Sequence, residues 1–169
     1  MAESEGLTAL EVLGLAIRSE VEAASLYARM SEQVRNDSLA AKLIFLQHEE
    51  EKHRRMLERQ YALRFPDVAL ELPQQSAVPT IGGIDFSNKT IPELFLLAIK
   101  AEVIAAAYYA HEADRSQDEV GRATLRYLSH IERGHYQMLE TEYELAARFP
   151  DYYNADDFRL GHELMHIGP

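Results

Sequence analysis

The sequence contains no cysteine among its 169 residues. Disulfide bonds, thiolate metal sites and thiol catalysis are therefore excluded, and any metal ion must be held by carboxylate and imidazole groups. Such ligands suit iron, manganese or zinc. No apolar run approaches the roughly 20 residues that cross a bilayer, so we expect no membrane association. The acidic residues 1–5 lack the basic start and apolar stretch of a signal peptide, which favours a cytoplasmic location.

Basic residues are few compared with acidic ones. The chain has 17 Lys and Arg against 28 Asp and Glu, a formal net charge of −11. Binding of nucleic acid needs a basic patch for the phosphates, and the sequence shows none, so we expect no nucleic acid partner. The 47% of hydrophobic residues in this length is enough for one folded domain with a substantial core.

Long stretches with apolar residues at helical spacing dominate the sequence. Thr8, Thr90 and Ser116 each have a glutamate three residues later, the spacing of a capping box at a helix start. Phe-Pro-Asp at 65–67 and again at 149–151 should end helices, because proline disfavours helix in the residue before it. We predict helices over residues 8–34, 39–63, 90–113 and 116–148.

One helical hairpin occurs twice in the chain. Leu15, Ala16 and Ile17, for example, recur unchanged 82 positions later, and many other positions do the same. The segment from Pro73 to Asn88 is the one plausible long connection between the halves. We therefore predict an all-α, antiparallel four-helix bundle over residues 1–152, made of two duplicated hairpins joined by a long crossover. Residues 153–169 would form a C-terminal tail with a possible short helix.

The repeated residues include metal-ligand types. Each half supplies one isolated carboxylate and one Glu-x-x-His pair, whose members lie on one face of a helix. Four carboxylates and two imidazoles form a ligand set for two metal ions. The candidate ligands are Glu20, Glu50 and His53 in the first half, and Glu102, Glu132 and His135 in the second.

The surroundings of the isolated glutamates support this assignment. Glu20 has Ala16, Ala23 and Ala24 on its face of the helix, and Glu102 has the equivalent alanines. Small residues leave room beside a carboxylate that a packed core would fill. A carboxylate in such an apolar strip must have a raised pKa or a positively charged partner, and two divalent cations would remove the repulsion among four of them.

The order Glu, Glu-x-x-His, Glu, Glu-x-x-His on four successive helices resembles the ferritin-like di-iron carboxylate superfamily, whose ligand set is a known pattern of helix bundles. The run Ala-Ile-x-x-Glu-x-x-Ala-x-x-x-Tyr at 16–27, repeated at 98–109, is most similar to the rubrerythrins. The resemblance extends to about residue 150.

This resemblance implies roles for the candidate residues. Glu50 and Glu132 would bridge two irons, with Glu20 and Glu102 as terminal carboxylates and the two histidines as nitrogen ligands. Tyr27 and Tyr109 lie seven residues after the isolated glutamates, where each hydroxyl can hydrogen-bond a ligating carboxylate. The alternative is that these tyrosines are core residues with hydroxyls satisfied elsewhere.

Two features of the family's pattern are missing. Rubrerythrins usually carry a further glutamate one turn from the third-helix ligand, and here Ile99 and Ala105 occupy the positions on either side of Glu102. They also usually carry a four-cysteine rubredoxin centre, and this chain has no cysteine. An electron donor would therefore have to be a separate protein.

The leading hypothesis is a di-iron oxidoreductase, of peroxidase or ferroxidase type, that reduces peroxide or dioxygen or oxidises iron(II). Manganese or zinc could take the place of the two irons. The alternatives are an iron-binding or storage protein without turnover, and a structural bundle that holds metal. A homodimer is the expected assembly, because similar proteins commonly form one.

Four further histidines, His48, His130, His162 and His166, are not among the candidate ligands of this cluster. His162 and His166, with Glu163 between them, match the His-Glu-x-x-His pattern of zinc proteases, but no downstream third ligand follows. We expect a short docked helix or an incidental metal site there. His48 and His130 recur at the 82-residue spacing but point away from the neighbouring glutamates, so we expect them in interhelical packing or hydrogen bonding rather than as ligands.

Overall fold

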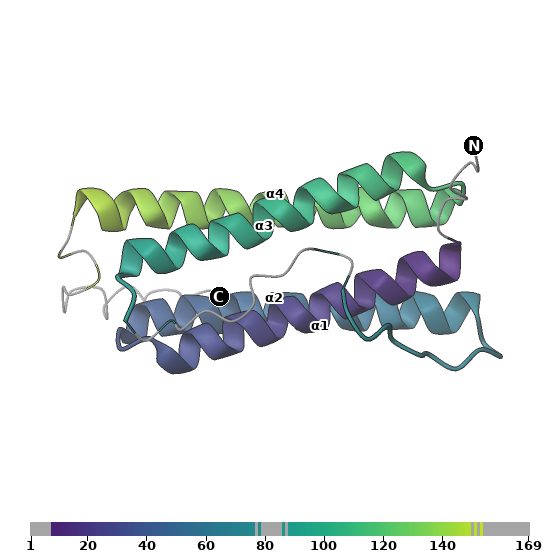
Figure 1. Ribbon diagram of the computed structural model, residues 1–169, viewed down its shortest axis with the longest axis horizontal. Coiled ribbons are helices and arrows are strands. Elements are labelled where there is room, and N and C mark those ends of the chain that lie inside the picture. The colour runs from purple at the N-terminus through teal and green to yellow at the C-terminus, as the bar shows by residue number, and fades with distance from the viewer. Residues whose placement is uncertain are drawn as a thin grey trace, which may run out of the picture.

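A computed structural model describes residues 8–76, 78, 86, 88–149, 151 and 153. Within them lie four helices, α1 (Ala9–Gln33), α2 (Asp37–Arg64), α3 (Ile91–Arg115) and α4 (Glu119–Arg148). Helix α1 packs along α2, and α3 packs along α4, as two antiparallel hairpins (Figure 1). The predicted four-helix bundle of two hairpins is thus confirmed.

Side-chain caps fix where all four of these helices begin. Thr8 and Thr90 each form the predicted capping box, in which the hydroxyl accepts from the backbone N–H three residues on and the glutamate there accepts from the threonine N–H. Asn36 caps α2 by accepting from the Leu39 N–H at 2.9 Å, so this helix begins two residues earlier than predicted. An asparagine that precedes a helix can start it as well as break the one before.

The start of α4 was predicted wrongly. Ser116 is the C-cap of α3, and Asp118 is the N-cap of α4, with its carboxylate accepting from the Gly121 N–H. A carboxylate is both a strong N-cap and a favourable charge at the positive end of the helix dipole, and here it also pairs with Arg64. Asp118 therefore takes the capping role that the serine spacing suggested for Ser116.

The crossover determines how the two hairpins face each other. Helix α2 ends at Arg64, immediately before Phe65-Pro66 as predicted, and the chain then returns along the bundle. Helix α3 begins at the end of the bundle where α1 finishes, so α1 and α3 run in opposite directions, as do α2 and α4 (Figure 1). Two residues of the crossover, Val78 and Phe86, are buried against the bundle.

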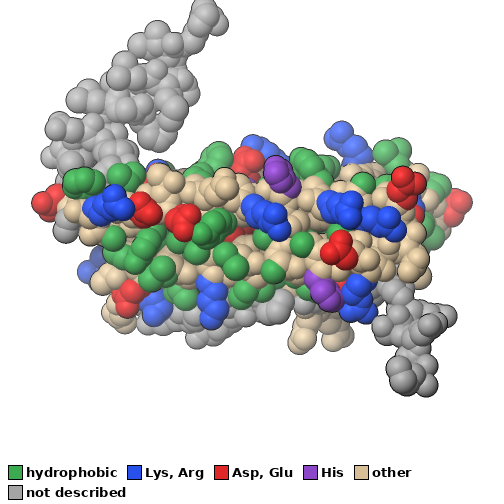
Figure 2. All heavy atoms as spheres, turned by 90° about the horizontal axis from the view of Figure 1, so that it is seen from above, with side chains coloured by type: hydrophobic (Ala, Val, Ile, Leu, Met, Phe, Trp, Pro, Cys, Tyr) green, Lys and Arg blue, Asp and Glu red, His purple; other side chains and the backbone are tan. Residues whose placement is uncertain are grey.

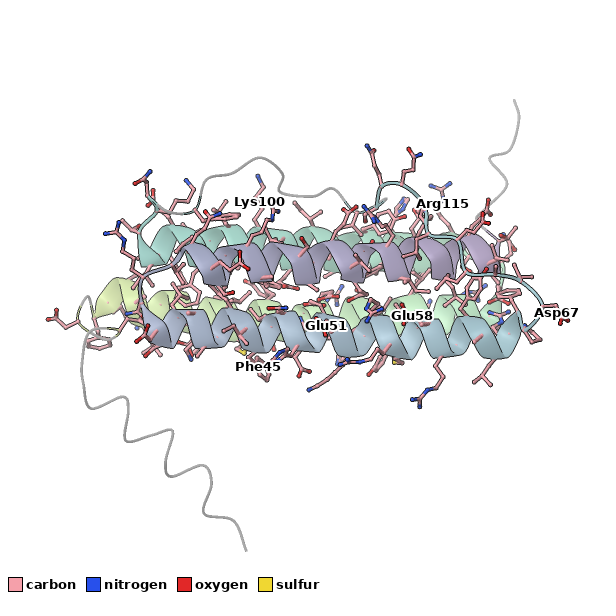
Figure 3. The ribbon with its side chains drawn as sticks, turned by 90° about the horizontal axis from the view of Figure 1, so that it is seen from below. Phe45, Glu51, Glu58, Asp67, Lys100 and Arg115 are labelled. Carbon is pink, nitrogen blue, oxygen red and sulfur yellow. The ribbon has the colours of Figure 1, made fainter. Side chains whose placement is uncertain are left out.

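The core consists of two apolar clusters rather than one. One includes Leu13, Ile17 and Leu57, and the other includes Leu43 and Phe95. Charged residues that are themselves buried lie between these clusters, along the middle of the helices: Glu20, Glu50, His53, Glu102, Glu132 and His135. In contrast, Phe45 and Lys100 lie on the outside of the bundle (Figure 3), and acidic, basic and hydrophobic side chains are interspersed on the face seen in Figure 2.

Polar contacts between the hairpins hold this arrangement. Both guanidinium nitrogens of Arg64 donate to Asp118 at 2.7 Å, which ties the end of α2 to the start of α4. Near the other end of these helices, Lys42 donates to Glu142 at 2.6 Å. A bidentate Arg–carboxylate pair fixes orientation better than a single contact does.

Among the described residues, no helix has both the length and the apolar composition needed to cross a bilayer.

Candidate metal centre

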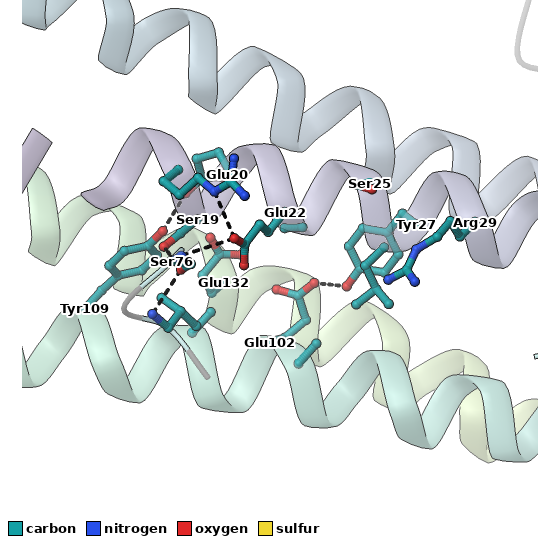
Figure 4. A pocket seen from close by; sticks show the side chains of 16 residues that line it. Ser19, Glu20, Glu22, Ser25, Tyr27, Arg29, Ser76, Glu102, Tyr109 and Glu132 are labelled. Carbon is teal, nitrogen blue, oxygen red and sulfur yellow. Dashed lines mark hydrogen bonds and ion pairs between the residues drawn. The ribbon is translucent and has the colours of Figure 1, made fainter. Parts of the chain in front are cut away.

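The isolated glutamates come from α1 and α3, and each is held by a tyrosine of the opposite hairpin. Tyr109 on α3 donates its hydroxyl to Oε1 of Glu20 on α1 at 2.8 Å, and Tyr27 on α1 donates to Oε1 of Glu102 on α3 (Figure 4). The sequence predicted a tyrosine–carboxylate contact. It did not show that the contact crosses between the hairpins, because that depends on their relative placement.

The Glu-x-x-His pairs come from α2 and α4, with their imidazoles facing each other. The rings of His53 and His135 are stacked, with centroids 5.6 Å apart. Nδ1 of His53 lies 3.2 Å from Glu50 and 3.4 Å from Glu20. Nδ1 of His135 lies 3.2 Å from both Glu132 and Glu50, and 3.6 Å from a Glu102 oxygen. Each imidazole therefore directs the same nitrogen toward carboxylates of the cluster.

The six side chains form two overlapping groups whose ligand atoms lie within 4.8 Å of one another. The first group consists of Glu20, Glu50, His53 and Glu132. The second consists of Glu50, Glu102, Glu132 and His135. Glu50 and Glu132 belong to both groups, while each of the other four belongs to one. The structure thus brings all six candidates together and gives two of them the shared position.

Burial makes the electrostatics of this cluster unusual. Loss of water raises the pKa of Glu20 to about 8 and that of Glu132 well above its ordinary value. For Glu50 the same burial is outweighed by the imidazoles of His135 and His53, which lower its pKa to about 2. The neighbouring carboxylates raise the pKa of His53 to about 9, although burial opposes this. Carboxylates so close together require positive charge among them, from imidazolium or from metal ions.

Two oxygens of the cluster indicate which kind of positive charge fits. Oε2 of Glu20 and Oε1 of Glu50 are buried, and although Nδ1 of His53 and Nδ1 of His135 lie 3.4 Å and 3.2 Å from them, no hydrogen bond from the described residues reaches either oxygen. Most buried polar atoms in proteins have such a partner, and one without it needs an explanation. A metal ion coordinated by these oxygens would supply the missing interaction. Carboxylate oxygen and imidazole nitrogen together suit iron, manganese or zinc, so the residues fit a dinuclear metal centre.

A cavity of about 320 Å³ lies over the carboxylate side of the cluster. Glu20, Glu102 and Glu132 line it, while the two histidines do not (Figure 4). The sequence predicted open space beside the isolated glutamates because of their alanine neighbours. Ala23 and Ala105 do line the cavity, whereas Ala16, Ala24, Ala98 and Ala106 are buried in the helix packing.

Sequence reasoning missed the polar residues that border this cavity on its outer side. Arg18, Ser19 and Glu22 come from α1, and Ser76 comes from the crossover. Ser19 and Glu22 have no counterpart of the same type in the second half, where Ala101 and Ile104 stand. This departure from the duplication is the feature of the sequence that could have identified Ser19 and Glu22 as residues of the site.

Of the remaining histidine predictions, one is wrong and the other concerns residues outside the described part of the chain. His48 and His130 are exposed on the outer faces of α2 and α4, so their prediction as interhelical contacts was wrong. Their direction away from the glutamates placed them toward solvent, because no further helix covers these faces within the described part of the chain. The pair His162 and His166, and the short helix suggested for the tail, lie outside the described residues.

A four-helix bundle with buried carboxylates and imidazoles in two overlapping groups defines the class of ferritin-like di-iron carboxylate proteins. The family model for rubrerythrin matches residues 11–143. The chain therefore belongs to the rubrerythrin family.

Solved structures agree with this assignment. A hypothetical protein from Pyrococcus furiosus is 32% identical, with a TM-score of 0.69 over 85% of this chain and 92% of that one. The bacterioferritin of Desulfovibrio desulfuricans, described as having a diiron site in different catalytic states, is 18% identical. Its TM-score is 0.66 over 86% of this chain and 83% of that one, a likeness of fold. No curated protein matches the chain.

Proposed function

We propose that this protein is a di-iron oxidoreductase that reduces peroxide or dioxygen, or oxidises iron(II), at the cluster of four glutamates and two histidines. The observation that carries the proposal is the sharing of Glu50 and Glu132 between the two ligand groups. A residue in both groups can bridge two ions, and bridging carboxylates hold ions close enough to act on one small molecule.

The membership of the two ligand groups supports a role for each of the six residues. Glu50 and Glu132 would serve both ions, Glu20 and His53 would hold one of them, and Glu102 and His135 would hold the other. Two ferrous ions held by these residues would supply electrons for the reduction of an oxidant. Mn or Zn could occupy the same oxygen and nitrogen ligands, with different chemistry.

The protein's own contribution is to hold and orient this cluster. The hydroxyls of Tyr27 and Tyr109 each fix one oxygen of a terminal carboxylate and leave the other free to bind metal. The apolar clusters on both sides restrict water. The cavity lies on the carboxylate side, which gives an oxidant a way to reach the ions without passing the imidazoles.

The chain needs partners for repeated turnover. An external electron-donor protein would return electrons to the ions, since this chain has no cysteine for an iron–sulfur centre of its own. A homodimer and a cytoplasmic location remain expectations.

Anaerobic loading with iron(II) tests the proposal. We expect two irons per chain and, after addition of hydrogen peroxide or oxygen, the absorbance of ferric iron, renewed on each cycle when an electron donor is present. Glu50→Ala should abolish this reaction. Glu51→Ala is the matched control, because the neighbouring Glu51 is partly exposed and pairs with Arg55 at 3.7 Å instead.

Other results would support the alternatives. An assembly of several hundred kilodaltons with many irons per chain would indicate storage, and iron taken up without renewal on a donor would indicate binding alone. Zinc that is held tightly, with no reaction of the iron-loaded protein toward either oxidant, would leave a structural role.

A further inference from the structure

The cavity over the carboxylates is larger than hydrogen peroxide or dioxygen requires. Its volume of about 320 Å³ lies in the range of roughly 300–1,000 Å³ that is usual for small-molecule sites. A water molecule takes about 30 Å³ of liquid, so two oxygen atoms would fill a small part of it. Buried polar groups lie at its base, namely the carboxylates of Glu20, Glu102 and Glu132 and the hydroxyls of Tyr27 and Tyr109 (Figure 4).

Small side chains at duplicated positions keep this space open. Ala23 follows Glu20 by three residues, and Ala105 follows Glu102 by three, so both stand one turn along from a candidate ligand. Ala101 lines the same wall. A glutamate at position 105 would fill the cavity with a further ligand; an alanine leaves apolar space beside the metal centre instead.

The crossover covers part of the cavity and is fastened to α1. The hydroxyls of Ser19 and Ser76 are 2.6 Å apart, and the Ser76 N–H donates to Glu22 at 3.1 Å. Arg18 donates to the same Glu22 oxygen at 2.9 Å, which neutralises this carboxylate. Val78, directly after this contact, adds an apolar surface to the lining. On the rim, Ser25 and Arg29 are exposed and mark the side that faces solvent.

The charge of the centre restricts which molecules fit here. Four carboxylates balance two divalent cations, and Arg18 balances Glu22, so a neutral ligand enters without leaving an unpaired charge in a buried site. The walls formed by Ala23, Ala101, Ala105, Leu26 and Val78 suit a hydrocarbon body.

We propose that this cavity is the binding site of an organic hydroperoxide, with its oxygens at the carboxylate cluster and its hydrocarbon body between α1 and α3. This inference rests on the proposed function and names its substrate class. The reduction cleaves the O–O bond and takes up two electrons and two protons, giving an alcohol and water. Each ferrous ion would supply one of the two electrons, and the external electron-donor protein would return them.

Binding is tested first, without redox chemistry, in the zinc-loaded protein. The probe is 2-phenyl-2-propanol, the alcohol formed from cumene hydroperoxide. With methyl-labelled alanine, we expect NMR cross-peaks between the probe and the methyl groups of Ala23 and Ala105. Ala105→Leu should remove the cross-peak to Ala23 while zinc stays bound, and Ala23→Leu, which fills the same space from the other helix, should remove the cross-peak to Ala105. Ala107→Leu is the matched control, because Ala107 is exposed on the same helix and does not line the cavity.

The rates of oxidation of the ferrous protein by cumene hydroperoxide and by hydrogen peroxide provide the second measurement. One methylene in an apolar pocket changes specificity by roughly 10–200-fold. We therefore expect Ala105→Leu to lower the ratio of the organic rate to the hydrogen peroxide rate at least about tenfold, and Ala107→Leu to leave it within about twofold.

Several results would overturn this inference. They are absence of probe binding to the zinc-loaded wild type, binding to both leucine cavity variants that is as tight as binding to the wild type, or reaction with hydrogen peroxide alone. The last result leaves the proposed function intact. A ferrous protein that reacts with neither peroxide would instead refute the peroxidase function, while the cross-peaks with zinc would still decide whether the cavity takes the probe.

Discussion

Removal of the Tyr109 hydroxyl tests whether the tyrosines orient metal-binding carboxylates. This hydroxyl donates to Oε1 of Glu20 at 2.8 Å, and the tyrosine is 1% exposed, so the packing around its ring holds the donor in place. Loss of a partner that orients a metal ligand typically lowers metal affinity 10–100-fold, or about 1.4–2.7 kcal/mol at 1.36 kcal/mol per decade. We expect Tyr109→Phe to weaken zinc binding by this amount. Tyr108→Phe is the matched control, since Tyr108 is adjacent and only half-buried.

A double-mutant cycle shows whether the effect passes through Glu20. Tyr109→Phe and Glu20→Gln should be strongly non-additive, because one removes the donor and the other changes its acceptor. Tyr109→Phe combined with Glu102→Gln should be closer to additive, because Tyr109 donates to Glu20 and not to Glu102. For Tyr27→Phe the pattern should be reversed, since Tyr27 donates to Glu102.

The assay is competition for zinc against a chromophoric chelator, with folding checked by circular dichroism. The reasoning is refuted if Tyr109→Phe binds zinc as tightly as Tyr108→Phe does. Equal coupling of Tyr109 to both glutamates would also refute it, because the crossed contacts between the hairpins would then have no specific effect on the metal.

Three further predictions concern the ligands, the fold and the metal. Glu50→Ala should remove both metals together, whereas Glu20→Ala should weaken one, as measured by metal content per chain; full content in Glu50→Ala would show that this residue does not bridge. Asp118→Ala should cost about 1 kcal/mol of unfolding free energy through loss of the α4 N-cap. Arg64 lowers the pKa of Asp118 to about 2, so its contribution is complete above the ordinary value of 3.8 and is lost as the pH falls toward 2. The difference in unfolding free energy between the wild type and Asp118→Ala, measured with urea, should therefore be smaller at pH 2 than at pH 6, with the exposed Asp114→Ala as control. Removal of metal by a chelator should lower the melting temperature, since free metal at 100 times its Kd stabilises the folded state by about 2.7 kcal/mol; an unchanged melting temperature would contradict coupling of metal binding to folding.

The sequence predicted the start of a helix correctly where the capping motif and the hydrogen bonds that it forms involve the same few residues. The capping boxes at Thr8 and Thr90 formed as expected, since a cap involves groups within one turn. Ser116 had the same spacing and does not cap α4, because Asp118 competes for the same backbone N–H groups and gains an ion pair from Arg64, which is 54 residues away. A contact at that separation has no local signal.

The outward histidines show a related limit. Helical periodicity placed His48 and His130 away from the glutamates, but it gives only a direction around the helix. Whether that direction meets another helix or solvent depends on the neighbours, and here it meets solvent.

By itself, the sequence determined the duplication, the two hairpins and the six side chains of the cluster, because helix periodicity and an 82-residue repeat place those groups on equivalent inward faces. Only the tertiary structure decided which residues share both ligand groups, that each tyrosine holds the glutamate of the other hairpin, and that the crossover fastens at Ser76 over a cavity. Spacing along a helix fixes a side chain's direction, while these contacts depend on the distance and rotation between hairpins. The packing of the two apolar clusters and of the crossover sets this distance and this rotation.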